Sequence, residues 1–168
     1  MNLYDRFVTS ALASILADRR SLGAALTMCN CWHKLRGALM SLTAVNPPGA
    51  AWPGLSQGVI AKGAGLFVTT GHVGTDAAGE PVTSSVEDQI VALFENIKKT
   101  LDAAGLGFEH VARMTNYVKS FDPEFLATFR AVRTRYLNQD VPPAGVMVQG
   151  GLYDERLLVE SEIIAIVP

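Results

Sequence analysis

The sequence has few cysteines, little net charge and no long apolar run, and each shortage excludes a class of protein. Its two cysteines among 168 residues are too few for a disulfide framework and suit a reducing cytoplasm. No apolar run approaches the roughly 20 residues that span a bilayer, so we expect no membrane segment. The formal net charge is −2, and without a Lys/Arg stripe the chain lacks the electrostatic footprint of a nucleic-acid partner.

Charge and composition divide the chain near Met40. Residues 1–40 hold five basic and two acidic groups, a net charge of +3, whereas the remainder carries a net charge of −5. The prolines and glycines of MSLTAVNPPGAAWPGLSQGV then favour an extended lead-in over a helix. We therefore predict an N-terminal extension at 1–40, helical or disordered, and a single domain at 41–168. An alternative hypothesis is that Met40 is the native first residue.

The cysteines lie in the motif CNCWH of this extension. Cys29, Cys31 and His33 supply three candidate metal ligands, but a closed zinc site needs four and the sequence offers no second cluster. No phosphate-cradling glycine loop and no nucleophile–base signature is present in the sequence. We therefore expect neither a metal site nor a cofactor.

The first half of the predicted domain contains two strand patterns and a helix pattern. Strands at 58–61 and 66–70 are separated by KGAG, where Gly63 and Gly65 can adopt the positive φ of a tight hairpin. In the helix, Ser84 and Glu87 form a capping box and Gly105 provides the C-terminal stop. Apolar residues recur there every three or four positions, and they predict one buried stripe: Val86, Ile90, Phe94, Ile97 and Leu101.

The second half predicts a strand at 111–118, a helix and two further strands, at 146–149 and 157–167. The helix begins with Asp122 as N-cap and Pro123 at its first position, and it carries a second apolar stripe: Phe125, Phe129, Val132 and Tyr136. Two amphipathic helices are both buried if they pack on one face of a sheet, so the fold class is α+β, a two-layer sandwich. Several strands are apolar on both sides, which predicts that a homo-oligomer covers the other face.

Two acids on the last strand, Glu160 and Glu162, stand two positions apart and therefore lie on the same face of the sheet. One interpretation is that they mark the solvent side of an edge strand. The other is that one of them lies in a pocket at a subunit boundary, where it assists proton transfer.

Several segments in register are similar to the Rid family of enamine/imine deaminases, also called the YjgF family. They are PGLSQGV, LFVTTGHVGTDAAGEPV, ENIKKTLDAAG, RMTNYVKSFDPEF, VPPAG and LLVESEIIAI. The resemblance implies a chorismate-mutase-like fold with a mixed sheet, a homotrimer, and three small-molecule clefts between adjacent subunits. It also implies that Glu160 is the catalytic glutamate that positions or deprotonates the attacking water, and that Glu162 has a structural role.

The chain departs from this family where substrate binds. The family's carboxylate-binding arginine, which follows the Pro-Ala turn, corresponds to Gly145, so the bidentate fork is absent. An aromatic hydroxyl of the opening strand corresponds to Leu55. Thr70 stands at a serine position and His72 at a glutamine position. By the resemblance, the residues expected to contact substrate are Thr70, Gly71, His72, Arg130, Gly145, Val146 and Met147.

Two of these residues have a structural alternative. Arg130 stands where relatives have asparagine, and it shares a helix face with Arg133 but not with Arg135. This face is either a solvated basic surface or a source of a substitute cation for the cleft. His72 is either a hydrogen-bonded residue at a strand end or an imidazole beside Glu160 that titrates near pH 6.5.

Two functions remain open at this point. The first is a small-molecule hydrolase that acts on C=N bonds, with Glu160 as general base and a substrate other than the usual 2-imino acid. The second is a non-catalytic small-molecule binding or interaction module on the same trimeric fold. Glu160 favours the first, whereas Gly145 and Leu55 favour the second. Ribonuclease activity, attributed to some relatives, is disfavoured by the acidic domain.

Overall fold

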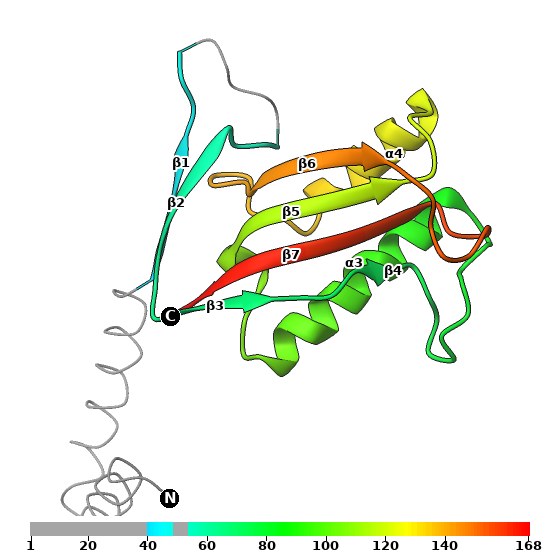
Figure 1. Cartoon of the computed structure of the whole chain (residues 1–168), viewed down its shortest axis with the longest axis horizontal. Helices are drawn as coiled ribbons and strands as arrows, with labels where there is room; N and C mark the ends of the chain where they lie inside the picture. The colour runs from blue at the N-terminus through cyan, green and yellow to red at the C-terminus, as the bar shows by residue number, and fades with distance from the viewer. Residues whose placement is uncertain (1–39, 49–53) are drawn as a thin grey trace, which may run out of the picture. The chain divides into compact units, whose positions relative to one another are not determined.

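The computed structural model describes residues 40–48 and 54–168 (Figure 1). The predicted extension lies outside the described residues except for Met40, and so do Cys29, Cys31 and His33. The elements are β1 (Ser41–Val45), β2 (Gly58–Lys62), β3 (Gly65–Val68), β4 (His72–Val73), α3 (Val86–Ala103), the 3₁₀ helix η1 (Phe108–His110), β5 (Val111–Val118), α4 (Pro123–Thr134), β6 (Ala144–Gln149) and β7 (Val159–Val167).

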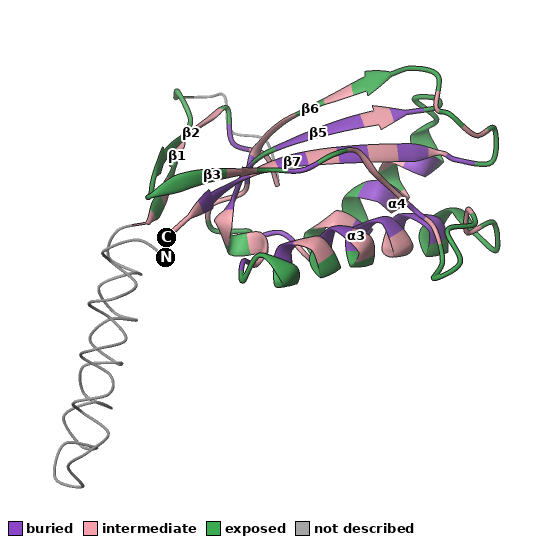
Figure 2. Ribbon diagram, turned by 60° about the horizontal axis from the view of Figure 1, so that its bottom comes forward, coloured by how far each residue is buried: buried purple, intermediate pink, exposed green. Residues whose placement is uncertain are grey.

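A mixed sheet forms the centre of the domain. Its strands run in the order β3-β7-β5-β6, and β4 also pairs with β7. β5 and β6 are parallel, whereas β7 is antiparallel to β3, β4 and β5. The helices α3 and α4 lie on one side of this sheet (Figure 2). The predicted α+β class with two helices on one face is therefore confirmed.

The helix α3 follows the predicted apolar stripe, with a cap one residue later than expected. Ser85, not Ser84, is the N-cap, and its side chain accepts a hydrogen bond from the Asp88 backbone N–H at 3.0 Å. Ser84 instead donates to the Asp88 carboxylate at 2.7 Å. The stop at Gly105 is confirmed, because this residue has φ +69°, which glycine adopts without strain.

The helix α4 begins as its sequence predicts. Asp122 is the N-cap and accepts a hydrogen bond from the Phe125 N–H at 2.9 Å, and Pro123 occupies the first turn. The stripe continues past the last helical residue, Thr134, to Tyr136. The Tyr136 ring stacks on Phe94 of α3, with 4.9 Å between ring centroids. Aromatic contacts of this kind add to the burial energy that holds the two helices together.

The core lies between the sheet and the two helices. Most of the predicted stripe residues are buried there, and Phe94 and Phe129 are fully buried. Val86, at the start of α3, is an exception with 38% exposure. The strands β5 and β7 contribute Met114, Val118, Val159, Ile163 and Ala165 to the same core.

The predicted hairpin between residues 58–61 and 66–70 is wrong. β2 pairs with β1, and β3 pairs with β7. Neither Gly63 nor Gly65 has a positive φ. The lead-in, expected only to be extended, supplies β1 as the partner of β2. Local turn residues suggested a hairpin, but long-range strand pairing decided the partners.

The sheet face opposite the helices is open and carries apolar residues. Because side chains alternate along a strand, the buried Val159, Ser161 and Ile163 face the helices, and Glu160, Glu162 and Ile164 face the other way. The outer strands add exposed apolar residues on this open face: Leu66 at 69%, Val68 at 64%, Val146 at 41% and Val148 at 42% exposure.

Candidate functional site

The carboxylate of Glu160 lies on the open face beside the break between β3 and β4. Glu160 is partly exposed and pairs with Tyr117 of β5 and Val73 of β4. Its carboxyl group occupies the space next to the Gly71 backbone, so that any Cβ at position 71 would overlap Oε1 of Glu160. Glycine at this position therefore allows the carboxylate to lie against the backbone of the break between β3 and β4.

The break between β3 and β4 has the form of a β-bulge. The chain takes four steps from Val68 to His72, whereas β7 takes three steps from Ile164 to Ser161. Thr69 is buried inside the bulge and its hydroxyl accepts a hydrogen bond from the Ile163 N–H at 3.0 Å. Bulges re-aim the residues that follow them, and here this brings Gly71 to Glu160.

His72 points toward the helices rather than toward Glu160. It pairs with Ser161, whose side chain faces the core, and its Nε2 lies 2.8 Å from the Thr100 hydroxyl of α3. Its Nδ1 lies 3.1 Å from the Thr70 carbonyl oxygen. Burial lowers the pKa of His72, against the opposing effect of that backbone contact. These contacts match the structural interpretation of His72; a role in a cleft stays a prediction.

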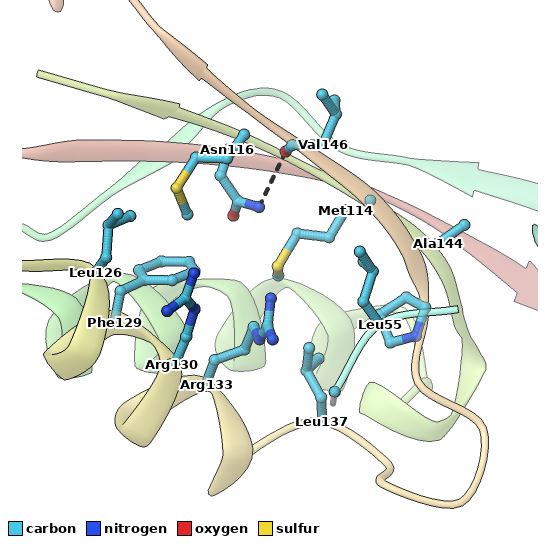
Figure 3. Close-up of a pocket in the computed structure, with 14 residues that line it drawn as sticks. Leu55, Met114, Asn116, Leu126, Phe129, Arg130, Arg133, Leu137, Ala144 and Val146 are labelled. Carbon is cyan, nitrogen blue, oxygen red and sulfur yellow. Dashed lines mark hydrogen bonds between the residues drawn. The ribbon is translucent and has the colours of Figure 1, made fainter. Parts of the chain in front are cut away.

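A pocket lies on the other side of the sheet, between β5, β6 and α4 (Figure 3). It encloses about 160 Å³. Its lining includes four of the residues predicted to contact substrate: Arg130, Gly145, Val146 and Met147. Leu55, Met114, Leu126, Phe129 and Leu137 make most of the remaining lining apolar. A concave, mostly apolar site with a few polar groups is typical of small-molecule binding.

Gly145 leaves no room for a side chain in this pocket wall. A Cβ at this position would lie 2.7 Å from the Met114 carbonyl oxygen of β5 and 3.5 Å from Cδ1 of Leu55. The first distance is shorter than real Cβ contacts. A side chain at position 145, arginine included, would therefore overlap the backbone of β5.

Two arginines of α4 line the pocket, whereas Arg135, the C-cap residue after the helix, does not. Arg130 and Arg133 both border the cavity, whereas Arg135 forms an ion pair with Glu87 on the surface at 2.7 Å. From the helical spacing, the sequence analysis placed Arg130 and Arg133 on one face and Arg135 on another, but it named only Arg130 as a substrate contact. The i, i+3 spacing from Arg130 was the available signal.

A buried polar pair connects the pocket to β7. Ser161 donates from its hydroxyl to Oδ1 of Asn116 at 2.8 Å, and Nδ2 of Asn116 donates to the Val146 carbonyl oxygen at 3.3 Å. Asn116 also lines the pocket. The sequence predicted a strand at 111–118 but did not predict this pair, since an Asn and a Ser 45 positions apart give no local pattern.

A protein-family model described as endoribonuclease L-PSP matches residues 47–167. The chain belongs to this family. A RutC family protein of Saccharolobus solfataricus is 32% identical over 111 residues, which are 66% of this chain and 84% of that protein. A RutC family protein of Pyrococcus horikoshii is 34% identical over 101 residues, 60% of this chain and 77% of that protein.

Solved structures of this family have the same fold. A Yersinia pestis protein, described as a protein of unknown function of the conserved Rid family, is 25% identical, with a TM-score of 0.65 over 76% of this chain and 99% of that chain. RidA of an Antarctic Psychrobacter species is also 25% identical, with a TM-score of 0.55 over 74% of this chain and 94% of that chain. The predicted membership of the Rid family is therefore confirmed.

The described part of the chain offers neither a membrane span nor a metal cluster. Neither α-helix there combines the length and apolar composition that a bilayer span requires. Within residues 40–48 and 54–168, no three His, Cys, Asp or Glu side chains are grouped so that they could hold a metal ion.

Within one copy of this L-PSP family chain, five of the eight predicted site residues fall into two groups. The first, which we call the glutamate half, contains Gly71 and Glu160 on the open face. The second, the pocket half, contains Arg130, Gly145 and Met147 on the helix side of the sheet. Glu160 does not line the pocket, although Ser161, the next residue, bonds to its wall.

Proposed function

We propose that the protein is a small-molecule hydrolase of the enamine/imine deaminase type, acting in clefts between the subunits of a homotrimer. The observation that supports this most is the division of the site into a glutamate half and a pocket half on opposite faces of one sheet. A single copy cannot bring Glu160 to a ligand in its own pocket. A neighbouring copy that packs on the open face supplies the missing half.

The open face supports the assembly. Leu66, Val68, Val146 and Val148 leave large apolar side chains exposed on the outer strands, and a monomer gains nothing from presenting them to water. In a ring of three copies each interface is heterologous, so that the glutamate half of one subunit meets the pocket half of the next. Each trimer then has three equivalent clefts.

The chemistry is the hydrolysis of a C=N bond. Water adds to the carbon atom while the Glu160 carboxylate accepts one of its protons. That proton is transferred to nitrogen, which gives a carbinolamine. The hydroxyl proton then passes to the same nitrogen as the C=O bond forms, the C–N bond breaks, and ammonia leaves a carbonyl product. Backbone N–H groups between Gly145 and Met147 polarise the electrophile and stabilise negative charge. No metal or cofactor takes part in this scheme.

A non-catalytic binding module is the second candidate, and Gly145 is the observation that favours it. The strand approach at Gly145 removes the position from which the family's arginine acts. A chain that kept the pocket without this contact could bind a small molecule without turnover. Glu160 would then have no chemical role.

Ammonia release from freshly generated imines and enamines separates these candidates. The hydrolase predicts turnover by the wild type and a loss of about 10²–10⁴-fold in Glu160→Gln, the range expected for removal of a general base. Glu162→Gln is the matched control, since Glu162 lies two residues along the same face and is also partly exposed. Equal activity of the Glu160 variant and wild type would remove Glu160 from the mechanism; no turnover by any variant would favour the binding module.

A further inference from the structure

Two guanidinium groups of α4 share one wall of the pocket. Arg130 and Arg133 are three residues apart and therefore lie on the same helix face. Figure 3 shows both side chains directed from α4 toward the sheet. Both border the cavity, whose opposite wall is formed in part by Gly145 of β6. The pocket thus has its cations on the helix wall and no side chain at the strand position.

The positive charge of this pair is not compensated by the residues that the structure describes. None of the ion pairs in residues 40–48 and 54–168 includes Arg130 or Arg133. No acidic side chain of this part of the chain lines the pocket. Burial lowers the pKa of Arg133, and the positive charge of Arg130 lowers it further. Arg133 is half-buried and Arg130 is exposed, and two like charges side by side at the mouth of a pocket favour the entry of an anion.

The rest of the lining is suited to an apolar group. Leu55, Met114, Leu126, Phe129 and Leu137 surround the cavity. A cavity of about 160 Å³ is comparable to engineered protein cavities of roughly 150 Å³ that bind benzene. Gly145 and Ala144 add little bulk on the β6 side. The pocket therefore has room for a ring or a branched aliphatic chain next to the two cations.

We propose that the pocket binds a small organic carboxylate with an apolar side chain, and that Arg130 and Arg133 hold the carboxylate from the helix wall. As a statement about substrate class this rests on the proposed function. It moves the anion contact from the strand, where Gly145 excludes an arginine, to α4. The apolar part of the ligand then lies against β6.

Calorimetric titration of the whole protein with sodium benzoate tests this proposal. Benzoate carries one carboxylate on a benzene ring, and benzamide is its uncharged analogue. We expect wild type to bind benzoate, and Arg130→Gln and Arg133→Gln each to weaken binding by about 10- to 100-fold, as for loss of a charge-assisted hydrogen bond. Arg133→Lys keeps the charge and retains part of the affinity. Arg135→Gln is the matched control and binds as wild type, because Arg135 pairs with Glu87.

The analogue separates anion recognition from a structural role of Arg133. The Nη2 atom of Arg133 lies close to the Gly54 backbone, since a Cβ built at Gly54 would be 2.9 Å away from this atom. A disturbed loop would weaken benzoate and benzamide alike, whereas loss of a cation weakens benzoate alone. Equal binding of the two ligands by wild type, or benzoate affinity unchanged in Arg133→Gln, would overturn the proposal. Tighter binding of inorganic phosphate, with the same dependence on both arginines, would overturn the choice of a carboxylate.

Binding measured in Glu160→Gln distinguishes this proposal from the proposed function. If the variant and wild type both bind benzoate through the arginines but no imine is hydrolysed, the carboxylate site stands and the hydrolase fails. If imines are hydrolysed with a KM that is unchanged in Arg130→Gln and Arg133→Gln, the hydrolase stands and the carboxylate site fails.

Discussion

Replacing Gly145 with alanine should destabilise the protein, although the same change usually stabilises a strand. Glycine in a strand interior is unfavourable by roughly 0.5–1 kcal/mol relative to alanine, so the unstrained change gains about that much. At Gly145, however, the new methyl group would lie 2.7 Å from the Met114 carbonyl oxygen. Relieving this overlap requires β6 to move away from β5.

The magnitude follows from the position of β6 at the edge of the sheet. Overpacking costs about 1–3 kcal/mol, and the middle of this range, about 2 kcal/mol, applies here because β6 can shift away from β5 only against Ser56, which bridges to Ala144 on its outer side. After subtraction of the gain from removing glycine, we expect a net loss of about 1 kcal/mol. For a domain of this size that lowers the melting temperature by about 4 °C.

Gly65→Ala is the matched control for this experiment. Gly65 lies in β3 of the same sheet, and a Cβ there would meet only the Val167 side chain at 3.9 Å, an ordinary contact. We expect this variant to be as stable as wild type or more stable. Urea unfolding of all three proteins at one protein concentration measures the difference, because assembly makes stability concentration-dependent. If the Gly145→Ala protein were as stable as Gly65→Ala, the close approach of β5 to position 145 would be refuted. Position 145 would then have room for a side chain such as the family's arginine.

Three further predictions follow from individual contacts. Glu160→Gln disables the glutamate half, and Met147→Trp obstructs the pocket half. When the two variant chains are co-expressed, about three-quarters of random trimers are mixed and each mixed trimer keeps one intact cleft of three, so about a quarter of wild-type ammonia release should be recovered. No recovery would place both halves in one subunit. Burial lowers the pKa of His72, so the contribution of the neutral imidazole to stability is present above about pH 6.5 and is lost as the pH falls through the lowered pKa. The wild type should therefore lose more stability than His72→Gln between about pH 7.5 and about pH 5. Parallel losses of the two proteins in urea unfolding would contradict this. Burial, then the hydrogen bond to Glu95 and its charge, raise the pKa of Tyr136 to about 12, so Glu95→Gln should shift the last phenol ionisation, followed by ultraviolet absorbance, to lower pH.

Much of the fold was predictable because burial leaves a periodic record in the sequence. The stripe through Ile90, Phe94, Ile97 and Leu101 predicted α3, and all four residues are fully buried. Asp122 and Pro123 predicted the start of α4, because an N-cap oxygen and a proline satisfy local backbone requirements. Alternation along β7 placed Glu160 and Glu162 on one face, as observed.

The errors concern features that local sequence does not determine. KGAG has the composition of a hairpin turn, yet β3 pairs with β7, about 100 residues further along the chain. The N-cap of α3 moved from Ser84 to Ser85 because two adjacent serines offer equivalent oxygens. The pairing partner and the choice between neighbouring caps both depend on packing.

The sequence by itself determined the family, the fold class and the candidate residues Glu160, Gly145 and Arg130, because each has a local pattern or a position in a recognisable motif. Only the tertiary structure decided that Glu160 and the pocket lie on opposite faces of the sheet, that Gly145 has no space for a side chain, and that Arg133 borders the cavity. These facts depend on the pairing of β7 with β3, β4 and β5 and on the packing of α4 against α3, which places Arg133 across the pocket from β6. Such contacts join residues far apart in the chain, where periodicity carries no information.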